Sequence, residues 1–175
     1  MVGRNIEIKA RLSRQDFDRI HRVAGELKTQ PHVVLEQRDT FFNTFRDRLK
    51  IREFSDGTAE LISYTRKEQD APKPSEYTRT PIPEPKTFCE AMASTVGIRG
   101  VVIKRRDLFL VGQTRIHLDQ VEGLGSFLEL EVVLRDDQSP AEGVVVANEL
   151  MDRLGIDADW LISNAYIDLL ESNGV

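Results

Sequence analysis

The amino-acid sequence predicts an antiparallel α+β fold. About eight segments have the alternating or β-branched pattern of strands, and most are separated only by short turns. Helical patterns stand between groups of strands rather than after each strand, which argues against a doubly wound parallel sheet. The length of 175 residues fits one domain spanning residues 1–175.

The first elements are a strand and an amphipathic helix. Residues 5–12 alternate strictly between polar and apolar side chains, as expected for a strand with two different faces. Ser13, with Asp16 three residues later, predicts a helix N-terminus. Apolar residues then recur at helical spacing from Phe17 to Leu27, so a helix is expected there.

The middle of the chain predicts short strands. Residues 38–43, 48–54 and 58–67 are strand candidates, and Asp56-Gly57 is a hairpin signal between the last two. Five of the seven prolines then lie between residues 72 and 85, around the extended residues 76–80. Proline donates no hydrogen bond to a sheet, so an edge or loop-flanked strand is expected there.

The last part of the chain predicts three strands and three helices. A short helix is expected from Thr87, with Glu90 as its capping partner, to Gly97. Ser139-Pro140-Ala141-Glu142 is a capping box that begins a helix ending near Gly155. The remaining elements are strands at residues 101–111, 114–121 and 127–134 and a final helix at residues 160–170.

Charged side chains share one face in each of five strands, because successive side chains of a strand point to opposite sides. Lys50 and Arg52 share a face, for example, and Glu129 and Glu131 do so in a later strand. The polar residues on these five faces, which are charged apart from Asn5 and a neutral His117, are Asn5, Glu7, Lys9, Arg11, Lys50, Arg52, Lys104, Arg106, Arg115, His117, Asp119, Glu129 and Glu131.

Two arrangements explain these faces. An open sheet with helices on one face and water on the other needs no ligand. Eight strands also tend to curl or close, and a closed barrel would turn the charges inward, where unpaired ions are costly. Such an interior needs a ligand: Lys and Arg suit a phosphate chain, and carboxylates suit a hard divalent cation.

Six short motifs follow one another along nearly the whole chain. They are I-E-I-K (6–9), Q-R-D-T-F-F (37–42), L-K-I-R-E (49–53), I-K-R-R (103–106), T-R-I-H-L-D (114–119) and G-L-G-S-F-L-E-L-E (123–131). This order resembles the CYTH superfamily of triphosphate tunnel enzymes, with its E-x-E-x-K signature. The run H-x-D-x-V-x-G-L-G-x-F at residues 117–127 resembles the class IV adenylyl cyclase branch more than the thiamine triphosphatase branch.

The resemblance implies an eight-stranded antiparallel closed β-barrel, a tunnel with flanking helices, that holds a triphosphate together with Mg²⁺ or Mn²⁺. It implies the metal ligands Glu7, Asp119, Glu129 and Glu131. The substrate-binding residues it implies are Lys9, Arg11, Lys50, Arg52, Arg66, Lys104, Arg106 and Arg115, with Lys67 as the alternative to Arg66. Arg79, after the proline-rich segment where the family has substrate contacts, is added to this set, although a solvent-facing Arg79 stays open. His117 is added because it lies on the charged face between Arg115 and Asp119. The expected catalytic residues are Glu7, Lys9, Arg115 and Asp119. A purely structural, hydrogen-bonded His117 stays open.

One residue departs from the signature, because Asn5 stands where the first Glu is expected. An amide still offers an oxygen to a hard cation, but one negative charge is lost. Three functions remain open. A class IV adenylyl cyclase would convert ATP to cyclic AMP and pyrophosphate, and the motifs favour this branch. The alternatives are a triphosphatase acting on inorganic or organic triphosphates, including thiamine triphosphate, and a non-catalytic nucleotide or polyphosphate binder.

The composition of the chain argues against two classes of binding partner, nucleic acids and membranes. The chain has 24 Lys plus Arg against 29 Asp plus Glu, a net charge of −5, which argues against a nucleic-acid partner. No apolar run reaches the roughly 18 residues that span a bilayer, so no membrane partner is expected.

The N-terminus lacks a signal-peptide pattern and Cys89 is the only cysteine, so a cytoplasmic protein is expected. A homodimer stays open. His21 and His32 match no ligand pattern and are expected at the surface.

Overall fold

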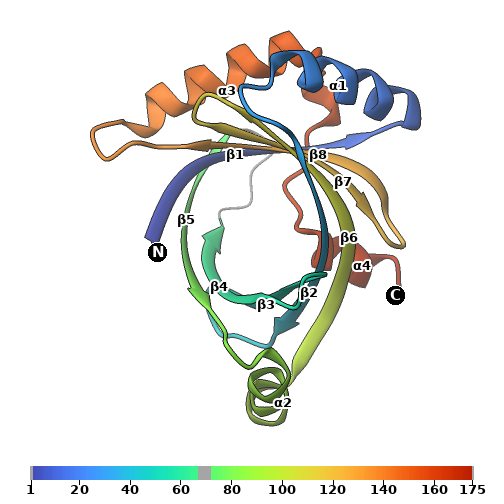
Figure 1. The fold of residues 1–175 in the computed structure, drawn as a ribbon, viewed down its shortest axis with the longest axis vertical. Helices are drawn as coiled ribbons and strands as arrows, with labels where there is room; N and C mark the ends of the chain where they lie inside the picture. The colour runs from blue at the N-terminus through green and yellow to red at the C-terminus, as the bar shows by residue number, and fades with distance from the viewer. Residues whose placement is uncertain (1, 67–71, 175) are drawn as a thin grey trace.

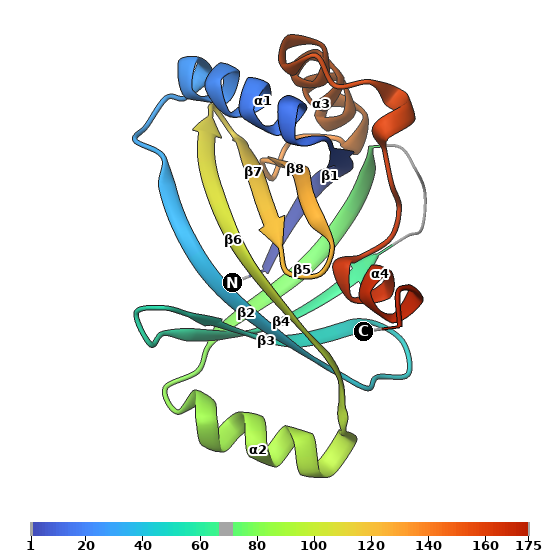
Figure 2. The same cartoon turned by 90° about the vertical axis from the view of Figure 1, so that its right-hand side faces the viewer.

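The computed structural model describes residues 2–66 and 72–174. Eight antiparallel strands close into a barrel in the order β1-β5-β4-β3-β2-β6-β7-β8, seen as a ring in Figure 1 and from the side in Figure 2. The strands are β1 (Val2–Leu12), β2 (Val33–Phe42), β3 (Arg48–Phe54), β4 (Ala59–Arg66), β5 (Lys73–Pro81), β6 (Ile98–Val111), β7 (Thr114–Val121) and β8 (Gly125–Val133). The helices are α1 (Arg14–Leu27), α2 (Pro85–Val96), α3 (Pro140–Leu154), the 3₁₀ turn η1 (Ala158–Trp160) and α4 (Tyr166–Ser172). The closed barrel with flanking helices is confirmed.

The main apolar core lies between the outside of the barrel and two helices. The helices α1 and α3 cover β1, β7 and β8 (Figure 1), and the core joins Ile6 of β1 and Leu130 of β8 to Ile20 of α1. Gly143 lets α3 approach β1 closely, because a Cβ atom there would lie 2.7 Å from Ile6 Cγ1. The apolar faces of β1, β7 and β8 are thus buried under helices, and the polar faces of these three strands point into the barrel.

The helix starts expected from capping residues are confirmed at Ser13 and Ser139. The Ser13 side chain accepts a hydrogen bond from the Asp16 backbone N–H at the start of α1, and the capping box of Ser139 and Glu142 begins α3. The helix expected from Thr87 begins earlier, at Pro85, because proline suits the first helical position.

The strand expected at residues 76–80 is present, but it is not an edge strand. β5 is longer and pairs with β1 on one side and β4 on the other. A closed barrel has no edges. Pro74 and Pro81 lie near the two ends of β5, where a missing backbone N–H removes little of the pairing.

The final helix expected at residues 160–170 is present, but its expected start is wrong. Trp160 ends η1, and α4 begins only at Tyr166. Between them the chain is extended because Leu161 forms a bridge with Ala10, and the Ile162 backbone N–H donates to Lys9 O at 2.9 Å. Pairing with β1 therefore replaces the first turns of the expected helix. None of the described helices is long and apolar enough to cross a bilayer.

Candidate active site inside the barrel

The barrel encloses a cavity of about 240 Å³. A smaller cavity of about 40 Å³ shares part of its wall and adds Asp39, Lys104 and Tyr166. The inward faces of all eight strands contribute polar side chains, which are Asn5, Glu7, Lys9, Gln37, Lys50, Arg52, Tyr64, Ser75, Tyr77, Arg79, Arg106, Arg115, His117, Glu129 and Glu131. The charged faces predicted from strand parity therefore converge on one enclosed space.

Three cations surround the carboxylate of Asp39 on β2. Asp39 Oδ2 accepts hydrogen bonds from Lys50 Nζ at 2.6 Å and Lys104 Nζ at 2.9 Å. Arg52, directly opposite on β3, donates to both Asp39 oxygens at 2.7 Å. One negative charge among three positive charges leaves this side of the cavity with excess positive charge. That excess suits a ligand with several negative charges.

Burial changes the protonation of this group. Burial and the nearby Arg52 lower the pKa of Lys50 to about 7, and burial lowers the pKa of Lys104 to about 8. Burial alone would raise the pKa of Asp39, but Arg52, Lys104 and Lys50 hold it well below its ordinary value. The carboxylate is therefore ionised at neutral pH, and the two lysines change charge near neutrality.

Arg106 of β6 lies two residues after Lys104 on the same face and organises a second group of carboxylates. Its Nε and Nη2 donate to Asp119 at 2.7 and 2.6 Å, and its Nη2 also lies 2.6 Å from Glu129. The hydroxyl of Tyr166 on α4 donates to Asp119 Oδ2 at 2.8 Å. Asp119 is fully buried, so both of its oxygens are committed to protein donors. Burial would raise the pKa of Asp119, but Arg106 holds it below its ordinary value.

Lys9 of β1 lies close to the same carboxylate cluster. Its Nζ is 2.8 Å from Glu129 Oε1 and 3.8 Å from the centre of the Tyr166 ring. Burial would raise the pKa of Glu129, but Lys9 and Arg106 hold it well below its ordinary value. Glu129 is therefore ionised, as a metal-binding carboxylate must be.

His117 forms a compact group with Glu129 and Glu131. Its Nδ1 lies 3.8 Å from Glu129 Oε2 and 3.8 Å from Glu131 Oε1, and the three donor atoms all lie within 4.8 Å of one another. Nδ1 is buried and has no hydrogen-bond partner among the described residues. A buried polar atom without a partner is unfavourable. One nitrogen and two carboxylate oxygens around a common centre fit a divalent metal ion.

Two residues of β1 line the same cavity as this group. Glu7 stands directly opposite Glu131 in the β1–β8 pair and lines the cavity. Asn5 is buried on the same face, and its Oδ1 has no hydrogen-bond partner among the described residues. Of the other two expected metal ligands, Glu7 thus lies opposite Glu131, whereas Asp119 is bound to Arg106 and Tyr166.

Most of the expected phosphate-binding residues line the barrel cavities, but three of them do not have a free cation in that position or cannot be placed there. Lys9, Lys50, Arg52, Lys104, Arg106, Arg115 and His117 face the two cavities. Arg79 also lines the larger cavity but is held by Glu60 at 2.6 to 3.0 Å. Arg11 is exposed and stacks its guanidinium over Phe127, 5.0 Å from the ring centre. Arg66 ends β4, and its side chain lies outside the described part of the chain, as does Lys67.

Sequence reasoning missed two residues that organise the site. Asp39 lies in one of the recognised motifs and has the same strand parity as Gln37, so parity could have placed it inside. Tyr166 comes from α4, and no local signal connects it with Asp119, 47 residues earlier.

Part of the cavity wall is apolar. Leu35, Phe54, Leu108 and Ile62 line the larger cavity together with its charged residues. A triphosphate needs only the charged part of this wall. The apolar part offers a surface for an organic group attached to the phosphates.

The sequence and the fold both have known counterparts. The family model for the CYTH domain matches residues 3–166. Adenylate cyclase CyaB from Aeromonas hydrophila is 31% identical over 85 residues, which are 47% of this chain and 44% of that protein. The match thus spans less than half the length of that curated relative.

Two solved structures show the same fold. PH1012 from Pyrococcus horikoshii OT3 superimposes with a TM-score of 0.81 at 24% identity and covers 94% of this chain and 98% of its own. HpAC1 from Hippeastrum, a candidate adenylyl cyclase with a dominant triphosphatase activity, superimposes with a TM-score of 0.66 at 17% identity, covering 97% and 96%. The resemblance indicated by the six motifs is thereby confirmed, and the chain belongs to the CYTH domain family.

Proposed function

We propose that the protein is a metal-dependent enzyme that converts ATP to cyclic AMP and pyrophosphate inside the barrel. One observation carries the proposal: a single cavity combines a cation-rich side around Asp39, the group of His117, Glu129 and Glu131, and an apolar part. These three parts suit a phosphate chain, a divalent cation and a nucleoside. The relative CyaB, an adenylate cyclase, supports the same activity.

The cations would bind the phosphates. Lys50, Arg52 and Lys104 supply the excess positive charge for the β- and γ-phosphates, which leave as pyrophosphate. Arg106, held by Asp119, points its guanidinium toward Glu129 and would contact the α-phosphate. Lys9, Arg115 and the half-buried Arg79 complete the basic wall.

The acidic group would hold the metal. His117, Glu129 and Glu131 would bind Mn²⁺ more readily than Mg²⁺, because an imidazole nitrogen suits Mn²⁺ better than the all-oxygen preference of Mg²⁺. When bound, the cation neutralises phosphate charge and lowers the pKa of the attacking hydroxyl. Glu7, opposite Glu131, is the carboxylate we assign to accept the proton of the 3′ hydroxyl.

The cyclisation of ATP needs no second substrate, because the attacking hydroxyl and the leaving pyrophosphate both belong to the same ATP molecule. The ribose 3′ oxygen forms a bond to the α-phosphorus, the bond from the α-phosphorus to the bridging oxygen of the β-phosphate breaks, and pyrophosphate leaves. The 3′ proton passes to the carboxylate of Glu7. The apolar residues Leu35, Phe54 and Leu108 would contact the adenine, which aligns the ribose with the α-phosphate.

The second candidate is a triphosphatase, in which water attacks the terminal phosphate. Asn5 favours it, because one carboxylate of the signature is missing beside the metal group. The dominant triphosphatase activity of HpAC1, which has the same fold, favours it too. This reaction needs only the charged part of the cavity, so inorganic triphosphate and thiamine triphosphate would be substrates.

For either enzyme we also propose a cytoplasmic location and a single domain over residues 1–175.

The test is product analysis of the purified protein with Mn²⁺ or Mg²⁺ by ³¹P NMR and anion-exchange chromatography. ATP should yield cyclic AMP and pyrophosphate in equal amounts. ADP with orthophosphate would replace this proposal by the triphosphatase. Binding of ATP without any product would exclude both enzymes and leave a nucleotide-binding protein.

A further inference from the structure

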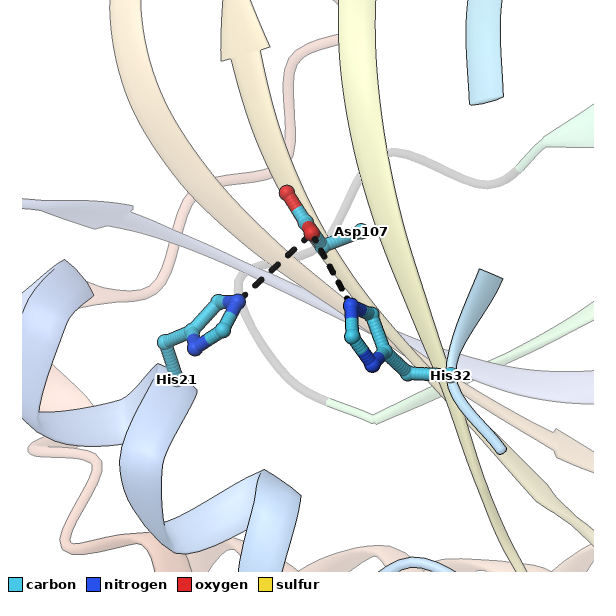
Figure 3. A group of neighbouring side chains, drawn as sticks. All are labelled: His21, His32 and Asp107. Carbon is cyan, nitrogen blue, oxygen red and sulfur yellow. Dashed lines mark ion pairs between the residues drawn. The ribbon is translucent and has the colours of Figure 1, made fainter. Parts of the chain in front are cut away.

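Three metal-binding side chains meet on the outside of the barrel. His21 comes from α1, His32 from the connection between α1 and β2, and Asp107 from β6. In Figure 3 both imidazoles point toward the carboxylate of Asp107. The sequence placed both histidines at the surface, and they are indeed about 40% exposed. It did not indicate that they approach the same carboxylate.

The donor atoms have the spacing of a metal site. His21 Nε2 lies 3.5 Å and His32 Nε2 lies 3.8 Å from the same oxygen, Asp107 Oδ1, and all three atoms lie within 4.8 Å of one another. A tetrahedral Zn²⁺ with bonds of about 2.0–2.2 Å separates its donors by roughly 3.3–3.5 Å. Small side-chain movements would therefore bring all three atoms to bonding distance.

A shared aromatic residue orients the two imidazoles. The ring of Phe109, a buried residue of β6, stacks with the His32 ring at 5.1 Å between centroids. It meets the His21 ring edge-on, also at 5.1 Å. The two imidazoles are in turn nearly perpendicular to each other, at 79°. The ligand rings are thus packed in place before any ion binds, which reduces the entropy lost on binding.

The carboxylate of Asp107 is buried but loosely paired. Its contacts to His21, His32 and Arg105 are 3.5, 3.8 and 3.6 Å. All three exceed the roughly 2.7–2.9 Å of a strong charge-assisted hydrogen bond. Among the described residues, this buried carboxylate therefore has only distant partners, which makes it a favourable position for a cation.

We propose that His21, His32 and Asp107 form a second metal site, for Zn²⁺, separate from the cavity of the barrel. Two imidazoles and one carboxylate are a zinc ligand set that leaves a fourth position for water or a small anion. Two of the three ligands, His21 and Asp107, also line a surface cavity of about 350 Å³ together with Asp18, Arg105 and Gln120, which would give such a ligand room to enter.

The bound ion would tie three segments together. It would join α1 and the α1–β2 connection to β6, whose opposite face carries Lys104 and Arg106. We expect Zn²⁺ to raise the melting temperature, because an ion that binds only the folded state stabilises it by mass action. This inference does not depend on the proposed reaction.

The test uses the full chain with Glu131→Gln, which removes one carboxylate of the inner group and keeps Glu129, the ion-pair partner of Lys9 and Arg106. Zn²⁺ is titrated by calorimetry, and Co²⁺ is added as a spectroscopic probe of the coordination. We expect one Zn²⁺ per chain, a higher melting temperature and visible Co²⁺ absorption bands of a tetrahedral site. His21→Ala and His32→Ala should each weaken binding at least tenfold, whereas Gln30→Ala, next to the site in sequence, should not.

Both histidines are about 40% exposed, so their variants should fold, and circular dichroism checks this. His32→Gln, which keeps a side chain of similar polarity, is a second variant should His32→Ala lose stability. The proposal is wrong if the background protein binds no Zn²⁺, or if the His21→Ala, His32→Ala double variant binds it as tightly as the background. Neither result would bear on ATP turnover.

Discussion

Lys104 Nζ lies 2.9 Å from Asp39 Oδ2, and both side chains are almost completely buried inside the barrel. Lys50 and Arg52 share the same carboxylate, so Asp39 balances only part of the surrounding charge. A buried cluster with excess charge is expected to lower stability unless a ligand completes it. The excess positive charge therefore favours the binding of an anionic ligand at the expense of stability. Variants of Asp39 test this trade-off between binding and stability.

Asp39→Asn should destabilise the protein, because it leaves three buried cations without their carboxylate. A loss of about 3–5 kcal/mol in the free energy of unfolding is typical when one partner of a buried ion pair is removed. Inorganic triphosphate should restore much of this loss, since its charges replace that of Asp39. The measurement is the melting temperature with and without triphosphate. A smaller ligand-induced rise in Asp39→Asn than in the parent would contradict the prediction.

Binding of inorganic triphosphate should take up protons near pH 8. Burial lowers the pKa of Lys50 to about 7 and that of Lys104 to about 8, so both are partly neutral there. A polyanion favours their charged forms and raises both pKa values. Affinity should therefore fall as the pH rises above 8.

Calorimetry in two buffers with different ionisation enthalpies measures this uptake. Lys50→Arg should reduce it, because arginine stays protonated at this pH. Lys86→Arg, in α2 at the surface, is the matched control. Equal binding enthalpies in both buffers for the parent protein would show that the lysines are already charged.

The same two lysines give stability a defined pH dependence. Their folded-state pKa values of about 7 and 8 lie below the ordinary value of 10.5, so the unfolded chain binds more protons between pH 7 and 9. The free energy of unfolding should therefore rise with pH across this window. Lys50→Met should flatten the rise in chemical denaturation measured at pH 7, 8 and 9. An unchanged slope would assign the effect to other groups.

Strand parity and order in the sequence predicted much of this site. The alternation in residues 5–12 alone separates the face that packs under α1 and α3 from the face that enters the cavity. Parity says which side a residue faces, but not which partner it meets. The pairing of Arg106 with Asp119 depends on the β6–β7 register, and Tyr166 reaches Asp119 only because α4 folds back against the barrel. The pairing of Leu161 with Ala10 is a long-range contact of the same kind.

Asn5→Glu should raise turnover at limiting metal. The Asn5 side chain is buried on the cavity face of β1, and its Oδ1 has no partner among the described residues. A carboxylate there adds a negative charge near the group of His117, Glu129 and Glu131, which favours cation binding. We expect a several-fold lower metal concentration for half-maximal activity, measured with ATP and Mn²⁺. Asn5→Gln, which adds length without charge, is the control, and an equal effect of both variants would exclude the charge as the cause.

Asp119→Asn separates two roles for this residue. The motif resemblance implies that Asp119 binds metal, whereas its contacts with Arg106 and Tyr166 favour a positioning role. In the positioning role the variant leaves Arg106 misaligned, so kcat should fall at least tenfold while the Mn²⁺ concentration for half-maximal activity stays the same. Tyr166→Phe, which removes only one donor to Asp119, should show the same pattern more weakly. Glu131→Gln provides the comparison, because removal of a metal ligand should raise the required Mn²⁺ concentration. If Asp119→Asn raises that concentration as much as Glu131→Gln does, Asp119 is a ligand, and its contacts with Arg106 must open when the metal binds.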